Sequence, residues 1–183
     1  MKLILVRHGE VEANVERILM GKNDSKLTQK GIEQNKNVGK KLKEKYKIDM
    51  VFCSPLSRCV KTLENILEEY PIDGQIFMSK LIEERDFGEY SNLGIDMIDW
   101  DEINEDNKIN EEMGVESLKD MEKRVNLFLE DLKLEDNNLT VLVVTHAGPI
   151  RIMKSKLNGK ETDFEEKIEN GSIMEFDLKA EGI

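Results

Sequence analysis

The stretch Lys2-Leu3-Ile4-Leu5-Val6-Arg7-His8-Gly9-Glu10 begins the chain with a short apolar run that ends abruptly in polar residues. A run of this kind is typical of a strand buried on both faces of a parallel sheet. The only other histidine follows a second apolar run, in Thr145-His146-Ala147-Gly148. Ligands of open α/β sheets bind beyond the carboxyl ends of the strands, so both histidines are candidates for one site.

Segments of strand length alternate with segments of helical periodicity along most of the chain. We expect strands at Lys2–Val6, Asp49–Cys53, Gln75–Met78, Thr140–Val144 and, as a half-exposed edge, Ser172–Leu178. We expect helices at Gln29–Tyr46 with Thr28 as N-cap, Ser57–Glu69, Glu116–Leu132 and Gly148–Leu157. This alternation predicts an α/β fold with a mainly parallel central sheet covered on both faces.

The stretch from Leu81 to Gly114 does not follow this alternation, because it is rich in acids and has only weak periodicity. We expect a single domain over residues 1–183 with an excursion, or cap, outside the sheet at about 89–113. Its acidic side chains would repel multiply anionic substrates if they faced a pocket, and they would otherwise form a solvated surface. These residues are Asp96, Asp99, Asp101, Glu102, Glu105 and Asp106.

Composition restricts the partners of the protein. A net charge of −11 argues against nucleic acid or an anionic membrane surface, and we expect the basic residues 40–47 to form a solvated helix face. No apolar stretch approaches the ~20 residues that span a bilayer, and residues 3–6 are too short for a signal peptide. The two cysteines, Cys53 and Cys59, make no disulfide framework, and we expect buried free thiols in a cytoplasmic protein.

Arg7 and His8 leave the first predicted strand together at the Gly9 turn. A guanidinium matches phosphate oxygens in a bidentate way, although a surface ion pair would also explain Arg7. An imidazole nitrogen can attack phosphorus and form a covalent intermediate, although His8 could also be an ordinary loop histidine. Arg58, at the start of a predicted helix, gains nothing from the helix dipole, which favours an anion shared with that helix terminus.

A metal site and a cysteine-based phosphatase loop are the two alternatives that the residues argue against. Neither histidine lies in a His-x-His or His-Glu-x-x-His array, so no metal is expected. The spacing from Cys53 to Arg58 is one residue too short for the cysteine signature. A proton donor for a leaving alkoxide could come from Glu83, Glu84 or Asp86, and the residues alone do not choose among them.

Taken together, these blocks resemble the histidine phosphatase superfamily, the phosphoglycerate mutase-like family, over nearly the whole chain. The resemblance is carried by Arg7-His8-Gly9-Glu10 with Asn14, Leu27-Thr28 with Gly31 and Gln34, Ser54-Pro55-Leu56-Ser57-Arg58 with Thr62, Glu84 with Phe87-Gly88, Glu116-Ser117 with Arg124, and Val144-Thr145-His146-Ala147-Gly148 with Arg151. Val11, the run after Gly88 and Ala147 depart from the common pattern without removing a reacting group.

The resemblance implies a three-layer α/β/α fold and catalysis through a phosphohistidine, with no metal or organic cofactor. His8 would be the nucleophile and Glu84 the acid. The phosphoryl oxygens would be held by Arg7, Asn14, Arg58, His146 and the backbone at Ala147.

Three functions follow as hypotheses from this resemblance. We expect a phosphatase of a small phosphorylated metabolite, such as α-ribazole phosphate or a sugar phosphate. A phosphoglycerate mutase is the alternative, although mutases of the family are usually longer. An inactive phospho-ligand-binding scaffold is the third, and it is disfavoured because every reacting residue is kept. The physiological substrate and the oligomeric state do not follow from the sequence.

Overall fold

The computed structural model describes residues 1–133 and 138–178 of the chain. Its sheet consists of β1 (Lys2–Arg7), β2 (Met50–Cys53), β3 (Gln75–Met78), β4 (Thr140–Thr145) and β5 (Ile173–Asp177). The strand order is β3-β2-β4-β1-β5. β5 is antiparallel to β1 at one edge, and the other pairs are parallel.

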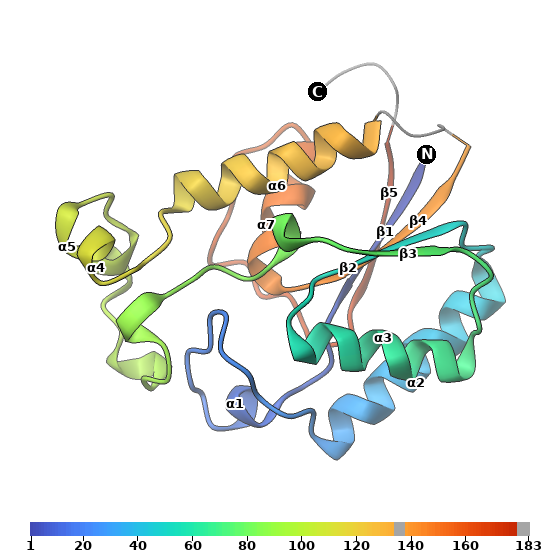
Figure 1. Ribbon diagram of the computed structural model, residues 1–183, viewed down its shortest axis with the longest axis horizontal. Helices are drawn as coiled ribbons and strands as arrows, with labels where there is room; N and C mark the ends of the chain where they lie inside the picture. The colour runs from blue at the N-terminus through green and yellow to red at the C-terminus, as the bar shows by residue number, and fades with distance from the viewer. Residues whose placement is uncertain (134–137, 179–183) are drawn as a thin grey trace.

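Long helices cover both faces of this sheet: α2 (Gln29–Lys45), α3 (Ser57–Glu69), α6 (Leu118–Lys133) and α7 (Ala147–Leu157). Figure 1 shows α2 and α3 on one side and α6 and α7 on the other. Alternate residues of a strand face opposite sides, so Ile4 and Val6 pack with α2 and α3, whereas Leu3 and Leu5 pack with α6 and α7. The predicted three-layer arrangement with a mainly parallel sheet is confirmed.

Local signals explain where the long helices begin. The Thr28 hydroxyl accepts a hydrogen bond from the Gly31 amide at 2.9 Å, which is the expected N-cap of α2. α6 begins two residues later than expected because the Ser117 hydroxyl caps it, accepting from the Asp120 amide at 3.0 Å. Leu127 of α6 is 47% exposed and lies outside the apolar core beneath α6 and α7.

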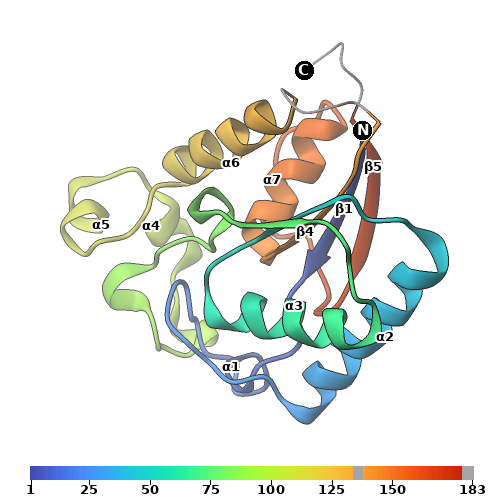
Figure 2. The same ribbon diagram turned by 45° about the vertical axis from the view of Figure 1, so that its right-hand side comes forward.

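Residues 80–117 form a chain of short helices, and all of them after the first lie outside the sheet layers (Figures 1 and 2). These are η1 (Lys80–Ile82), η2 (Gly88–Tyr90), η3 (Ile95–Met97), α4 (Trp100–Asn104) and α5 (Lys108–Glu112). The elements after η1 enclose a separate apolar cluster of Leu19, Phe87, Ile98, Ile103 and Val115, whereas Ile82 of η1 belongs to the core beneath α6 and α7. Leu19 comes from the loop after a one-turn helix, α1 (Glu12–Val15), a helix that the sequence analysis did not predict.

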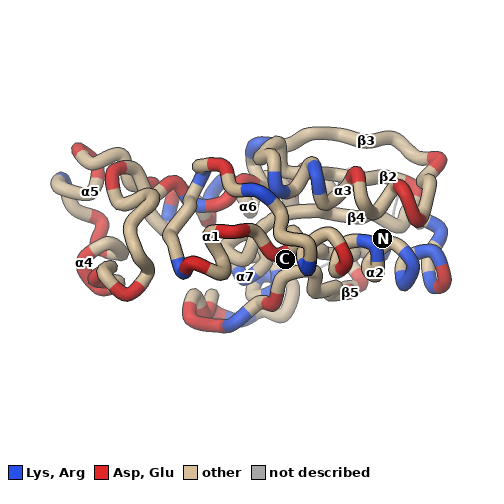
Figure 3. The backbone as a smooth tube through the Cα atoms, turned by 90° about the horizontal axis from the view of Figure 1, so that it is seen from below, with Lys and Arg blue, Asp and Glu red and all other residues tan. Residues whose placement is uncertain are grey.

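The acids of this excursion are surface residues. Figure 3 shows Asp and Glu gathered around α4 and α5, at the end of the molecule away from the sheet. Asp96 pairs with Arg17, and Asp99 caps α4 by accepting from two amides. All six acids named above are exposed, which supports the solvated-surface alternative. Over the described ranges, no helix is both long and apolar enough to cross a bilayer.

Candidate active site

The carboxyl ends of β1, β2 and β4 meet at one edge of the sheet and bring the predicted residues together. Arg7 ends β1 and His8 follows it, while His146 follows β4. The imidazole rings of His8 and His146 meet edge to face with their centroids 5.2 Å apart. Arg58, in the first turn of α3, donates from Nε to His146 Nδ1 at 3.2 Å. Residues distant in sequence therefore share one buried cluster.

His8 is held with one ring nitrogen free. Its Nδ1 lies 2.8 Å from the Gly9 carbonyl oxygen, which can only accept, so Nδ1 carries the proton and Nε2 presents a lone pair. The side chain is 3% exposed. Burial lowers the pKa of His8 well below its ordinary value, and the positive charges of Arg58 and Arg7 lower it further. The imidazole is therefore neutral and nucleophilic near neutral pH.

His146 is also neutral, but both of its nitrogens have partners. Because Nδ1 accepts from Arg58, the proton lies on Nε2, which donates to the Ser54 hydroxyl at 2.8 Å. Burial is the main cause that lowers the pKa of His146 well below its ordinary value. Any oxyanion that binds His146 has to compete with Ser54 for this proton. Sequence reasoning did not predict this competition.

Arg58 fastens a loop as well as a histidine. Its Nη1 donates to the Asn23 carbonyl at 2.8 Å and its Nη2 to the Gly21 carbonyl at 2.6 Å. With Nε on His146, three of its five N–H donors have partners among residues 1–133 and 138–178, which leaves two that an anion could use. The expectation of a helix-terminal anion clamp did not include this anchoring of residues 21–23.

Arg7 has a buried N–H donor, on Nε, whose acceptor is not among the described residues. Its Nη1 donates to the carbonyl of Ile168, while its Nε is buried and has no hydrogen-bond partner among residues 1–133 and 138–178. Burial lowers the pKa of Arg7, and the nearby Glu84 carboxylate opposes that shift. Leaving a buried donor of a charged group unpaired is costly, so the site is built to receive an acceptor.

The structure separates the three candidate acids by their partners. Glu83 forms an ion pair with Lys22 at 3.3 Å, and an Asp86 carboxylate oxygen accepts from the Gly88 amide at 3.0 Å. Glu84 instead accepts from the Gly148 amide, at 3.4 Å, in the first turn of α7 directly after His146. Of the three, Glu84 is therefore the acid placed beside the histidine cluster.

Asn14 and Ala147, the remaining predicted phosphate ligands, lie at the same edge. Asn14 belongs to α1 and accepts on Oδ1 from the Val11 amide at 3.2 Å. Ala147 is the first residue of α7, where N–H groups have no partner within the helix. Asn170, which sequence reasoning missed, donates to both the His8 carbonyl and Asn14 Oδ1 at 3.1 Å. An isolated asparagine so far along the chain gave no local signal.

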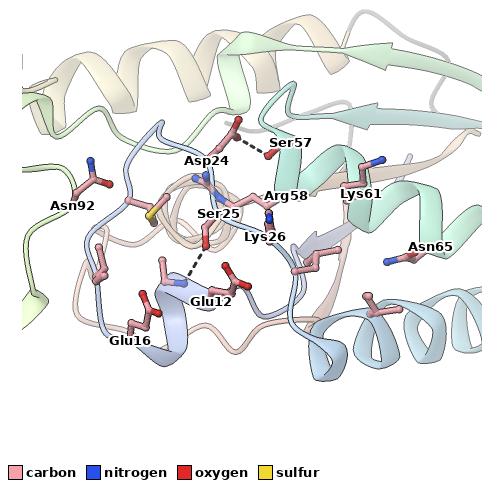
Figure 4. A pocket seen from close by; sticks show the side chains of 15 residues that line it. Glu12, Glu16, Asp24, Ser25, Lys26, Ser57, Arg58, Lys61, Asn65 and Asn92 are labelled. Carbon is pink, nitrogen blue, oxygen red and sulfur yellow. Dashed lines mark hydrogen bonds between the residues drawn. The ribbon is translucent and has the colours of Figure 1, made fainter.

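A pocket of about 760 Å³ opens beside this cluster. Figure 4 shows it between α1, the loop that carries Asp24 and Ser25, and the beginning of α3, with Ser57 hydrogen-bonded to Asp24. Arg58 lines it, whereas His8, Glu84 and His146 are not among its lining residues. The described part of the chain also contains no group of three or more His, Cys, Asp or Glu positioned to hold a metal ion.

Comparison with known proteins decides the family. The sequence model of the histidine phosphatase superfamily (branch 1) matches residues 3–183. The chain belongs to the histidine phosphatase superfamily. The 2,3-bisphosphoglycerate-dependent phosphoglycerate mutase of Mesorhizobium japonicum is 34% identical over 93% of this chain and 87% of its own length. Phosphoserine phosphatase 1 of Hydrogenobacter thermophilus is 33% identical over 87% of this chain and 77% of its own.

Solved structures of superfamily members have the same fold. An α-ribazole phosphatase from Shigella flexneri superposes with a TM-score of 0.81 at 25% identity, covering 98% of this chain and 91% of its own. A phosphoserine phosphatase from Entamoeba histolytica, in complex with 3-phosphoglyceric acid, has a TM-score of 0.73 at 27% identity and covers 95% and 89%. The resemblance inferred from the sequence motifs is thus confirmed at the level of family and fold.

Proposed function

We propose that this protein is a phosphomonoesterase that needs no metal and hydrolyses a small phosphorylated metabolite through a phosphohistidine on His8. One observation carries the proposal: a buried, neutral His8 lies in the same cluster as Arg7, and within the described part of the chain His8 Nε2 and the Arg7 Nε donor have no hydrogen-bond partner. A phosphoryl group would supply that acceptor. Family membership and the phosphatases among the relatives support the same activity.

In the first step, His8 Nε2 attacks phosphorus, the P–N bond forms and the bond from phosphorus to the ester oxygen breaks. Glu84, protonated at that moment, gives its proton to the departing alkoxide. Arg7, the two unused N–H groups of Arg58, and the backbone amide at Ala147 stabilise the charge on the phosphoryl oxygens. Asn14 assists from α1.

In the second step, water attacks phosphorus, the P–N bond breaks and inorganic phosphate forms. The carboxylate of Glu84 takes the proton of the attacking water and is ready for the next cycle. His8 returns to the neutral form that burial favours. We place this activity in the cytoplasm, where phosphorylated metabolites occur and where thiols such as Cys53 and Cys59, both free here, stay reduced.

A mutase is the second candidate, because the Mesorhizobium relative is a phosphoglycerate mutase and 87% of its length is covered. Chain length therefore does not separate the two activities. A mutase returns the phosphoryl group to an organic acceptor, whereas a phosphatase gives it to water. Incubation with 3-phosphoglycerate distinguishes them: phosphate release supports the proposal, and isomerisation to 2-phosphoglycerate without release supports the mutase.

The central test of the proposal is the substitution His8→Ala. We expect it to abolish turnover of phosphomonoesters and the acid-labile radiolabel that the wild-type protein takes up from labelled substrate, with the fold retained by circular dichroism. Glu83→Gln is the matched control, because Glu83 faces Lys22 rather than the cluster, and it should keep the label. Labelling that persists in His8→Ala would contradict the assignment of the nucleophile.

A further inference from the structure

Arg124, on α6, spends all five N–H groups of its guanidinium on the protein. Nη1 donates to the carbonyls of Leu81 at 2.9 Å and Glu83 at 2.7 Å, and Nη2 donates to the carbonyl of Glu84 at 3.2 Å. The remaining two donors, on Nε and Nη2, form a fork on the Glu116 carboxylate at 2.5 and 2.8 Å. A guanidinium has five donors, so none is left for a ligand.

The segment that these bonds hold is the one that carries the proposed proton donor. It runs between η1 and η2, where carbonyl groups depend on partners from elsewhere in the chain. Glu116 also binds this segment, because its carboxylate accepts from the Asp86 amide at 3.2 Å and its own amide donates to the Asp86 carbonyl at 2.9 Å. Arg124 and Glu116 together form a clamp on the main chain. The main chain is thus fixed on both sides of Glu84.

Burial strengthens this arrangement. The side chains of Arg124 and Glu116 are 16% and 14% exposed, so their bidentate pair is largely screened from water. Two parallel hydrogen bonds between a guanidinium and a carboxylate also fix the orientation of the two side chains, which the single ammonium group of a lysine would not do. α6 packs against both η1 and α7, and the Gly148 amide of α7 donates a hydrogen bond to the Glu84 carboxylate. The pair therefore sets where that carboxylate lies relative to the sheet edge.

We infer that Arg124, oriented by Glu116, is a positioning residue for Glu84 as proton donor. This inference rests on the proposed function and adds a residue that touches neither substrate nor phosphoryl group. Its consequence is selective: a misplaced acid slows the departure of alkoxides, which must be protonated, and leaves the departure of p-nitrophenolate nearly unchanged. General acid catalysis contributes about 10²- to 10⁴-fold, so a displacement should cost alkyl substrates a measurable part of that range.

The experiment compares kcat/KM for a series from p-nitrophenyl phosphate through phenyl phosphate to glycerol phosphate. This parameter includes steps only up to the phosphoenzyme, so the later attack of water does not enter. For Arg124→Lys and Glu116→Gln we expect losses of about 10- to 100-fold on glycerol phosphate, within the range of acid catalysis, and less than about 3-fold on p-nitrophenyl phosphate. The dependence of log kcat/KM on leaving-group pKa should become steeper.

Arg17→Lys is the matched control, because Arg17 also forks onto a carboxylate, that of Asp96, but at an exposed site. It should leave the whole series unchanged. An equal loss across all leaving groups in both clamp variants would overturn the inference. Thermal unfolding establishes that each variant is folded, and Glu116→Gln, which keeps the arginine, serves if Arg124→Lys unfolds. A wild-type protein that forms no phosphoenzyme would instead count against the proposed function.

Discussion

The two histidines occupy surroundings that disfavour their protonated forms. Each is almost fully buried, and the guanidinium charges near each ring lower its pKa further, so the pKa of both lies well below the ordinary value of 6.5. For a nucleophile this is the useful direction, because only the neutral ring has a lone pair to offer. The acid limb of kcat/KM should therefore lie below pH 6.5 if it reports His8.

The same shifts predict how stability depends on pH. Below pH 6.5 the unfolded chain protonates its histidines while the folded chain does not, so their contribution is complete above 6.5 and lost on acidification. Each histidine adds a slope of up to about 1.4 kcal/mol per pH unit. Lowering the pH from about 7 to about 5 should destabilise the wild-type protein more than the His146→Asn variant. Urea unfolding at each pH measures the free energy of unfolding of both proteins. Equal slopes would show that His146 titrates normally in the folded state.

At the scale of elements, the first turn of α7 allows no side chain at Gly148. A Cβ there would lie 2.3 Å from Glu84 Oε1 and 2.4 Å from Met121 Cε. Gly148→Ala should displace the Glu84 carboxylate and reduce kcat/KM for alkyl phosphates by at least about 10-fold, within the range of acid catalysis. It should also cost about 1–3 kcal/mol of stability by overpacking.

Gly94→Ala is the control for this substitution, since the nearest atoms to its added Cβ, in Met97, are 3.7 Å away at ordinary contact distance. It should retain full activity on the same alkyl phosphate. If Gly148→Ala also retained it, Glu84 would either tolerate the displacement or not be the acid. Urea unfolding of both variants separates the cost in stability from the loss of activity.

Elements that bury one or two regular faces could be predicted from their periodicity. The helix at Ser57–Glu69 was predicted with its observed bounds, and so was the strand at Gln75–Met78, although all four residues of that edge strand are exposed. The one-turn helix α1 and the cluster around Ile103 could not, because they depend on contacts between loops distant in sequence. In the same way, Arg7 and His8 were found from their place at a strand end, while Asn170 depends on a tertiary contact.

The whole molecule contains separate apolar clusters rather than one continuous core. One lies on each side of the sheet, and the third lies within the excursion. The excursion is joined to residues 18–19 by the β-bridge of Ile18 with Gly94 and by a hydrogen bond from the Leu19 amide to the Leu93 carbonyl. A local opening of α4 and α5 would therefore disrupt the third cluster without exposing the two clusters beside the sheet. Stability should be unevenly distributed between the sheet and this region.

Native-state hydrogen exchange tests this distribution. Amides of α4 and α5, in short helices with exposed faces, should exchange through openings of lower free energy than amides of β4, whose residues 141–145 are buried. Ile103→Ala should lower the protection of the excursion further while leaving that of β4 nearly unchanged. Equal protection in both regions would mean that the excursion unfolds only together with the sheet.

The turn before β5 holds the beginning of the chain. The Ile168 carbonyl accepts from Arg7, the Gly171 amide donates to the carbonyls of Arg7 and His8, and the Arg7 amide donates to the Ser172 carbonyl. During synthesis Arg7 and His8 therefore leave the ribosome before this turn, which follows them by more than 150 residues. We expect a nascent chain whose central strands have formed to remain inactive until the turn before β5 has been synthesised.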